Sequence, residues 1–288
     1  AISESGLNIN SLDGIAATAG PGLIVCLNVG LNIGKAIAGA LDKPFLGINH
    51  LEGHALSPRI NQKITFPYLL LLISGGHTQF LEVNGVNEYR RLGTTIDDAL
   101  GEAFDKTAKL LGIEFPGGPM IEEWAKKGDE NYFKLPKPIF KKGGCNMSFA
   151  GLKTAVLRTS KNLKNIKEKY DLAASFQKTI NEILYEKTKV AMQKFLINKI
   201  NKRKNFVIAG GVASNLSIRK NLMNLANEKN FIPVFPPINL CSDNAAMIGW
   251  AGIERYKINL IDNLKIPVKP RWPLDSKAPF LKGSGLKL

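Results

Sequence analysis

Two histidines four residues apart are the feature of this sequence that most directly suggests chemistry. They are His50 and His54 of His50-Leu51-Glu52-Gly53-His54, and the 288-residue chain has only one further histidine, His77. On an α-helix, residues i and i+4 lie on one face one turn apart, so both imidazoles can bind the same cation. The alternative is two unrelated surface histidines. The spacing favours the metal site.

The same segment argues against a zinc protease. The HExxH pattern of those enzymes has glutamate directly after the first histidine, where this chain has Leu51. Glu52 comes one position later and would point to another side of a helix. A metalloprotease is therefore disfavoured.

A third ligand is expected, because two neutral imidazoles usually share a metal with an anionic group. Asp243 follows a strand and a Pro-Pro loop, near the carboxyl end of a strand, where α/β sheets collect their active sites. From the residues alone, a plain N-cap of the following helix is the simpler role for Asp243. Two histidines and one carboxylate with open positions suit Fe(II), and Zn(II) nearly as well.

Three glycine-rich segments could bind an anionic or nucleotide-like ligand. Ser74-Gly75-Gly76-His77-Thr78 lies between two strands, where backbone N–H groups could face an anion. Gly210-Gly211-Val212-Ala213-Ser214-Asn215 lies between a strand and a helix, which suits a phosphate or ribose. Asn215 could bond a base or ribose, or simply cap the helix. Gly117-Gly118 allows close approach of a ligand, or is only a turn between helices.

Strands and helices alternate along the chain, which predicts an α/β protein with partly parallel sheets. The expected strands are 14–17, 45–48, 68–73, 78–83, 89–92, 206–209 and 231–235, with a hairpin turn at Asn84-Gly85. The expected helices are 23–41, one capped by Asp97 or Asp98 and ending near Leu111, one from Met120 or Ile121, 172–198, 216–229 and 243–256. On one of these helices we expect Glu102 to form ion pairs on a solvated face.

The chain is strongly basic, with a formal net charge of +15. This charge indicates either a polyanionic partner, most commonly nucleic acid, or a lysine-rich composition without binding meaning. Basic residues gather at 153–169 and again at Lys199, Lys202, Arg203 and Lys204. No apolar run is long enough for a membrane span, and three dispersed cysteines are typical of reduced thiols in a cytoplasmic protein.

The order of the motifs along nearly the whole chain resembles that of one family, the TsaD family of tRNA N6-adenosine threonylcarbamoyltransferases, formerly called glycoproteases. The motifs that carry the resemblance are Thr18-Ala19-Gly20-Pro21-Gly22, His50–His54, Ser74-Gly75-Gly76-His77-Thr78-Gln79, Gly101-Glu102-Ala103-Phe104-Asp105-Lys106, Pro116-Gly117-Gly118-Pro119, Ser148-Phe149-Ala150-Gly151-Leu152-Lys153-Thr154, Gly210–Asn215, Cys241-Ser242-Asp243-Asn244-Ala245 and Pro270-Arg271-Trp272-Pro273-Leu274.

The resemblance implies a two-lobed, actin-like and sugar-kinase-like (ASKHA) fold with a nucleotide cleft. It implies transfer of the threonylcarbamoyl group from threonylcarbamoyl-adenylate to N6 of adenosine 37 in tRNAs that read codons starting with A. It implies one iron or zinc ion on His50, His54 and Asp243, and bacterial relatives need a TsaB-like paralogue and a TsaE-like ATPase. The implied substrate contacts are Ile73, Ser74, Gly75, Gly76, His77, Asp105, Gly118, Glu122 and Asn215.

The start of the chain departs from the family pattern. Family members begin with a strand and an acidic, Ser/Thr-rich phosphate loop, whereas this sequence starts at Ala1 beyond them. We expect residues 1–66 and 240–288 to form an incomplete first lobe with the metal ligands, and residues 67–239 to form the substrate-binding lobe. The chain is then a fragment, or a decayed copy that is not catalytic. Two further hypotheses are an ATP-dependent kinase of the same superfold and a non-catalytic TsaB-like scaffold, but neither needs the histidine pair.

Overall fold

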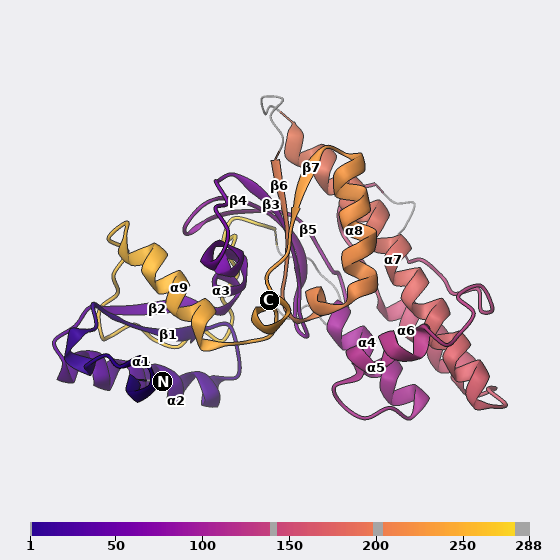
Figure 1. Cartoon of the computed structure of the whole chain (residues 1–288), viewed down its shortest axis with the longest axis horizontal. Coiled ribbons are helices and arrows are strands. Elements are labelled where there is room, and N and C mark those ends of the chain that lie inside the picture. The colour runs from indigo at the N-terminus through magenta and orange to yellow at the C-terminus, as the bar shows by residue number, and fades with distance from the viewer. Residues whose placement is uncertain (1, 139–142, 198–203, 280–288) are drawn as a thin grey trace.

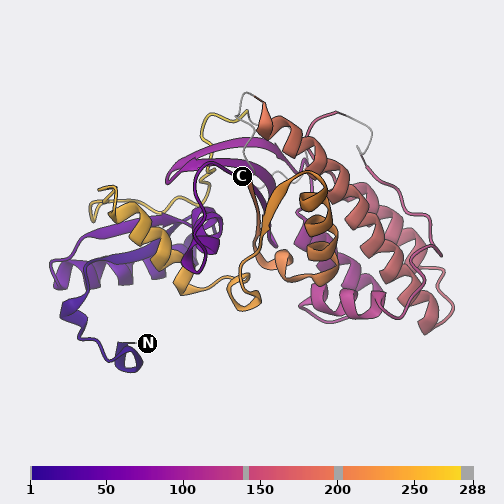
Figure 2. The ribbon, with the colours of Figure 1, turned by 45° about the horizontal axis from the view of Figure 1, so that its top comes forward.

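The computed structural model describes residues 2–138, 143–197 and 204–279 and confirms an α/β protein. Figures 1 and 2 show a small sheet at one end of the molecule and a larger sheet, with most of the helices, at the other. The basic residues Lys199, Lys202 and Arg203 lie outside the described residues. None of the helices in the described part combines the length and apolar composition that a membrane span requires.

The small sheet pairs β1 (Ile15–Gly20) in parallel with β2 (Phe45–Asn49). Helices α2 (Ile24–Ala40) and α9 (Ala245–Tyr256) cover its opposite faces (Figure 1). Successive strand residues point to opposite faces. A Cβ on Gly34 of α2 would accordingly meet Ala17, and a Cβ on Gly252 of α9 would meet Ala16. Glycine at these two positions lets both helices pack closely on the strand.

The larger sheet has the order β5-β4-β3-β6-β7. Its strands are β3 (Tyr68–Ile73), β4 (Thr78–Gly85), β5 (Glu88–Thr94), β6 (Lys204–Ala209) and β7 (Phe231–Val234). The β3-β4 and β4-β5 pairs are antiparallel, and β6 pairs in parallel with β3 and β7. All six residues of β3 are buried, as expected for a central strand covered on both faces.

Alternate residues of β3 face two different hydrophobic layers. Leu69, Leu71 and Ile73 belong to the core formed with helices on one face, whereas Leu70 and Leu72 pack with α3 (His50–Leu56) on the other. The helices of the first face include α4 (Leu100–Leu111), α6 (Ala150–Ser160), α7 (Ile166–Leu196) and α8 (Leu216–Glu228). The remaining helices are α1 (Ile2–Ser5) and α5 (Gly117–Ala125), with short 3-10 turns η1 (Ile9–Ser11), η2 (Ser57–Ile60), η3 (Gly211–Ser214) and η4 (Ile238–Leu240).

Helix α3 lies between the two sheets. Leu51 and Ala55 pack against the larger sheet, and Leu56 packs with Ile48 of β2 and Met247 of α9. The small sheet falls within predicted residues 1–66 and the larger one within residues 67–239. The division into two lobes with those bounds stays a prediction.

Several predicted boundaries are wrong. Helix α5 begins at Gly117, not at Met120 or Ile121, and α6 forms where no helix was expected. The hairpin turn lies at residues 86–87, where Asn87 has φ 63°, and not at Asn84-Gly85. Asparagine tolerates this left-handed conformation better than most residues.

The predicted cap of α4 is also wrong. Helix α4 begins at Leu100 without a side-chain cap. Asp97 instead accepts hydrogen bonds from the backbone N–H groups of Phe149 (2.7 Å) and Ala150 (3.2 Å), at the start of α6. Asp98 forms ion pairs with Lys106 and Lys153. The Asp97 carboxylate therefore precedes α4 in the sequence but accepts hydrogen bonds from the start of α6, 53 residues further along the chain.

Candidate metal centre and ligand cavity

The two histidines lie on one short helix that starts where β2 ends. Asn49, the last residue of β2, caps α3 by accepting a hydrogen bond from Leu51 N–H at 2.9 Å, and its amide donates to Trp272 O at 3.0 Å. His50 is the first helical residue, and His54 follows one turn later. The predicted arrangement on one helix is confirmed.

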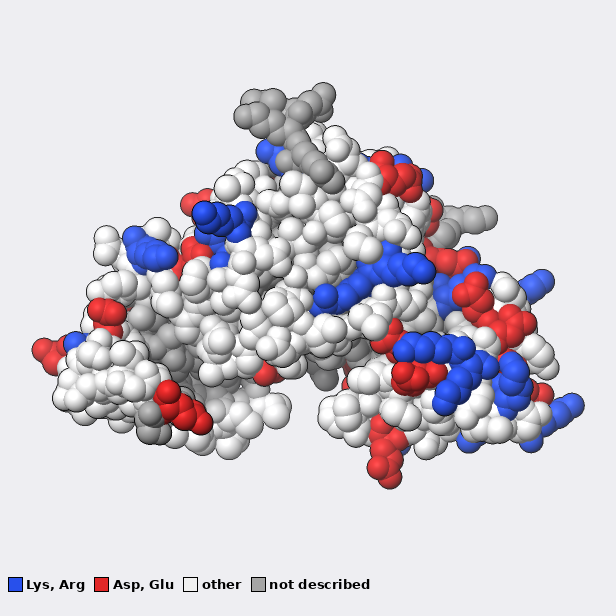
Figure 3. Space-filling model, viewed as in Figure 1, with Lys and Arg blue, Asp and Glu red and all other residues white. Residues whose placement is uncertain are grey.

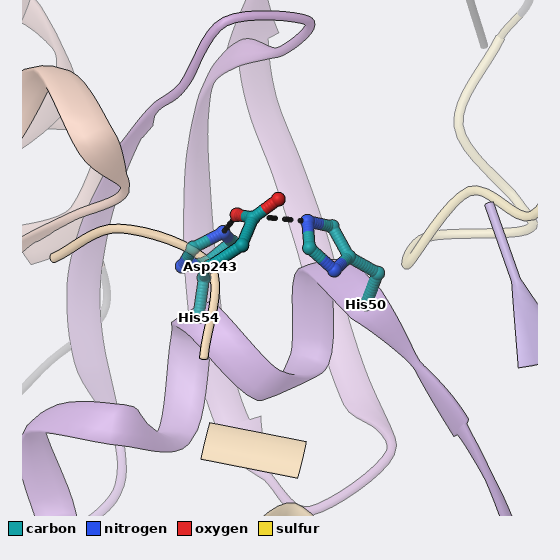
Figure 4. Close-up of side chains that lie close together, drawn as sticks. All are labelled: His50, His54 and Asp243. Atoms are coloured by element: carbon teal, nitrogen blue, oxygen red, sulfur yellow. Dashed lines mark hydrogen bonds and ion pairs between the residues drawn. The ribbon is translucent and has the colours of Figure 1, made fainter. Parts of the chain in front are cut away.

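Asp243 approaches the histidines from the loop before α9 (Figure 4). Its Oδ1 lies 3.0 Å from His54 Nε2 and 3.4 Å from His50 Nε2, and the two imidazole rings are nearly perpendicular. One ligand atom from each residue fits within 4.8 Å of the others. We call these three residues the histidine corner.

Asp243 is not the cap of α9. The cap is Asn244, whose side-chain oxygen accepts a hydrogen bond from Met247 N–H at 2.8 Å. The capping alternative for Asp243 is therefore wrong, and its carboxylate is available to the histidines. The neighbouring Asn244, which was not predicted as a cap, has this role instead.

The electrostatics of the corner favour an anionic carboxylate. Hydrogen bonds from His50 and His54 hold the pKa of Asp243 well below its ordinary value. The side chain of His54 is fully buried, that of His50 is 23% exposed and that of Asp243 is 75% exposed, so the group is open on one side. Two imidazole nitrogens and one carboxylate oxygen with open positions fit Fe(II) or Zn(II).

Glu52 anchors the helix that carries the histidines. It is fully buried, and its Oε2 accepts a hydrogen bond from Arg255 Nε at 2.6 Å. Its Oε1 accepts from Asn87 N–H at 3.0 Å and from the Tyr89 hydroxyl at 2.9 Å. Burial raises the pKa of Tyr89 well above its usual value, so the hydroxyl stays protonated and donates.

The Glu52–Arg255 ion pair joins the two elements that position the corner. Glu52 lies on α3 between the two histidines. Arg255 lies on α9, the helix that begins shortly after Asp243. As the sequence indicated, Glu52 points away from the histidine face. Its anchoring role was missed. The available signal was a carboxylate and a guanidinium in two largely apolar segments, since each buried charge requires some partner of opposite sign.

A cavity of about 810 Å³ opens beside the corner, and Asp243 contributes to its wall. Most of the remaining wall comes from the turn after β3, from α4, α5 and the loop between them, and from the η3–α8 segment. Six predicted substrate contacts line this cavity, namely Ser74, Gly75, Asp105, Gly118, Glu122 and Asn215. Ile73, Gly76 and His77 do not line it, and Ile73 is fully buried at the end of β3. The binding roles of all nine stay predictions.

The glycines around the cavity fall into two groups. A Cβ on Gly75, Gly118 or Gly211 would meet no atom within 4 Å, so the backbone at these lining positions is bare towards the open space. A Cβ on Gly101 would instead come within 2.7 Å of Gly75 Cα. Gly210 has φ 97°, and a Cβ there would clash with the carbonyl oxygen of Ile73. The second group allows the turns to pack together, and the first leaves room for a ligand.

The polar side chains of the wall are held by neighbouring backbone. Asp105 accepts from Gly117 N–H at 3.0 Å, and Glu122 accepts from Ser217 N–H at 2.9 Å. Asn215 accepts from Ile218 N–H at 2.9 Å and donates to Gln177 at 2.8 Å. Of the two roles left open for Asn215, the helix cap is shown. These contacts tie α4 to α5, and α5 to α8, around the cavity.

The fold and site together define an α/β protein with a His–His–Asp corner at the rim of a glycine-lined cavity. The family model described as "TsaD: tRNA N6-adenosine threonylcarbamoyltransferase" matches residues 1–250, and the chain belongs to this family. The predicted resemblance is confirmed.

Curated relatives agree with this assignment, and a solved structure of another protein shares the fold. A tRNA N6-adenosine threonylcarbamoyltransferase of Pelagibacter ubique (strain HTCC1062) is 66% identical over 100% of this chain and 81% of its own length. One from Zymomonas mobilis is 52% identical over 99% of this chain and 78% of its own length. HypF of T. kodakarensis is 16% identical, with a TM-score of 0.62 over 87% of this chain and 42% of HypF, and therefore shares the fold alone.

Proposed function

We propose that this chain transfers the threonylcarbamoyl group from threonylcarbamoyl-adenylate to N6 of adenosine 37 in tRNAs that read codons beginning with A. The observation that carries the proposal is the histidine corner at the rim of a glycine-lined cavity, in a chain 66% identical to a relative named for this activity. The two-lobed, actin-like and sugar-kinase-like architecture is part of the proposal, and the fold shared with HypF supports it.

The cavity is the place we assign to the adenylate. Its volume of about 810 Å³ lies within the range of cofactor-sized pockets. The bare backbone at Gly75, Gly118 and Gly211 allows a ligand to approach peptide N–H groups without side-chain obstruction. Asp105, Glu122 and Asn215 accept hydrogen bonds from backbone N–H groups and so hold the surrounding helices in place.

The corner is the place we assign to one Fe(II) or Zn(II) ion. His50, His54 and Asp243 would hold it, and the low pKa of Asp243 keeps this ligand deprotonated. A bound ion of this kind supplies Lewis acidity towards phosphate or carbonyl oxygens. Because Asp243 also lines the cavity, that acidity would act on the ligand the cavity holds.

Direct transfer fits the cavity better than a covalent intermediate. In it, the N6 amine of adenosine attacks the carbamoyl carbon, the bond from that carbon to the phosphate oxygen breaks, AMP leaves, and N6 loses a proton. Of the three serines that line the cavity, Ser74 and Ser214 have hydroxyls that are hydrogen-bonded to the backbone of His77 and Gly211. Neither bond joins the hydroxyl to a general base, which a serine nucleophile needs.

The reaction is tested by incubating the chain with threonylcarbamoyl-adenylate, tRNA and its partner proteins, followed by mass spectrometry of the tRNA nucleosides. We expect threonylcarbamoyladenosine at position 37, and its absence would contradict the proposal. A single turnover with labelled adenylate and no tRNA tests the direct route. Label trapped covalently on the protein would exclude that route.

The partners and compartment belong to the same proposal. They are a TsaB-like paralogue, a TsaE-like ATPase and tRNA, in the cytoplasm. The net charge of +15 supports a tRNA partner, and Figure 3 shows lysine and arginine side chains, mixed with acidic ones, over the helical end of the molecule. Affinity for tRNA should fall steeply with salt, since phosphate contacts release counterions. Binding that does not respond to salt would contradict this view.

A further inference from the structure

Phe115 is the most exposed large hydrophobic side chain in the described part of the chain. It is 83% exposed, and it lies in the loop between α4 and α5, just before Pro116 and Gly117. An apolar ring of this size gains nothing from the hydrophobic effect in water. Its position beside the glycine-lined cavity makes it a candidate contact for a ligand.

Phe115 stands where two cavities meet. Besides the cavity of about 810 Å³, a second of about 560 Å³ lies against α4. Gly75, Asp105 and Phe115 line both, whereas Lys106 and Lys109 line only the second. The second cavity includes no residue of the histidine corner. A transfer between two substrates needs two adjoining sites, and these cavities adjoin at the Gly75 turn.

The wall of the second cavity suits an uncharged planar ring. Lys106 neutralises Glu102 at 2.6 Å and also contacts Asp98 at 3.3 Å, while Asp105 is held by Gly117 N–H. Glu102, Asp105 and Lys106 therefore have partners within the protein, while the Glu114 carboxylate of the same wall is exposed to solvent. Lys109 is exposed and forms no ion pair with any other described residue, so its amine is available to a phosphate.

We propose that Phe115 is a stacking platform for the acceptor base, an unpaired adenine of RNA, in the second cavity, and that Lys109 contacts an adjacent phosphate. The proposal rests on the proposed function and adds the acceptor site to it. RNA-binding proteins commonly hold splayed bases on aromatic rings, and this stacking is tolerant of base identity. A base on Phe115 would enter beside Gly75, at the junction with the adenylate cavity.

The test uses an anticodon stem-loop RNA with 2-aminopurine at the acceptor position, because stacking quenches its fluorescence. The full chain with its partner proteins is compared with Phe115→Ala, Phe115→Trp and, as a matched control, Tyr132→Ala, an exposed aromatic outside both cavities. We expect quenching with the native chain, its loss in Phe115→Ala, and its retention in Phe115→Trp and Tyr132→Ala.

Steady-state kinetics with unmodified tRNA distinguishes a role of Phe115 in the acceptor site from a role in the donor site. In Phe115→Ala the KM for tRNA should rise by about tenfold, within the range that base stacking contributes. Affinity for AMP, used as the probe of the adenylate cavity, should change less than the KM for tRNA, although Phe115 also lines that cavity. In Lys109→Gln the salt dependence of tRNA affinity should weaken by about one phosphate contact.

Two results would overturn the proposal. One is a fall in AMP affinity with an unchanged KM for tRNA, which would place Phe115 in the donor site. The other is equal quenching in the native chain and in Phe115→Ala. Quenching needs no chemistry, so a chain that quenches without forming threonylcarbamoyladenosine refutes the proposed function and keeps the base site.

Discussion

The histidine corner and the glycine-lined cavity adjoin each other but are built in opposite ways. The corner is formed by side chains, and the side chains of His54 and of the anchoring Glu52 are fully buried. In the cavity, positions such as Gly75 and Gly118 contribute by having no side chain. We therefore expect the corner to be impaired by substitutions that remove side-chain atoms, and the cavity to be impaired by substitutions that add them.

The strongest test of this comparison removes a ligand. His54→Ala should lower metal affinity by more than about 100-fold, beyond the usual loss from changing a residue behind a metal ligand. Metal content is measured by mass spectrometry after gel filtration. His77→Ala removes the third histidine, which lies outside the corner, and should keep the metal. Equal metal content in both variants would contradict the corner as the metal site.

Removing the anchor behind the corner should have the next largest effect. Glu52→Gln leaves Arg255 buried without its carboxylate, and breaking a buried ion pair costs about 3 kcal/mol in free energy of unfolding. Metal affinity should also fall, by about tenfold, because α3 and α9 lose their connection.

Urea denaturation and metal titration measure the two effects of Glu52→Gln. Glu130→Gln is the matched control, since Glu130 and Lys178 form an ion pair at the surface, worth about 0.5 kcal/mol or less. If both variants were equally stable, the anchoring role of Glu52 would be wrong.

Adding one methyl group to the cavity should separate stability from binding. Gly118→Ala places a Cβ in open space within α5, so the helix should gain up to about 1 kcal/mol. The same methyl group narrows the cavity, and AMP affinity should fall by about tenfold.

Gly249→Ala is the control for the methyl group, since Gly249 lies in α9, also has open space around it and does not line the cavity. It should stabilise the chain and leave AMP affinity unchanged, as calorimetry can show. Unchanged AMP binding in Gly118→Ala would contradict a ligand-binding role for the bare backbone of the cavity.

The smallest expected effect comes from Asn215, whose side chain caps α8. Asn215→Ala should lower the free energy of unfolding by about 1 kcal/mol, the usual cost of losing a cap. Asn215→Asp keeps the cap and should restore most of that stability. If Asn215→Asp were as unstable as Asn215→Ala, the capping role of Asn215 would be wrong.

Local patterns in the sequence predicted the elements that do not depend on distant contacts. The fully apolar run 68–73 became β3 with the predicted ends, and the i, i+4 spacing of the histidines correctly indicated a shared helix. Residues 50–56 form a helix because β2 ends in Asn49, which caps it locally. These signals are short-range, so they can be read from the chain alone.

Contacts between distant segments could not be read in the same way. Asp97 is next to α4 in sequence but accepts hydrogen bonds from the start of α6. This pairing depends on where the folded chain places Phe149 and Ala150. Asp243 and Asn244 are both good caps by residue type, and only the folded chain shows which one faces the histidines. The Glu52–Arg255 pair spans 203 residues, a separation at which sequence pattern carries no pairing information.

The most direct measurement of the central claim is threonylcarbamoyladenosine formation by the metal-stripped and metal-restored chain. The corner predicts that product is lost on stripping and returns with Fe(II) or Zn(II) in the native chain, and that neither ion restores it in His54→Ala. Full product formation by verified metal-free protein would contradict a metal-dependent role for the corner.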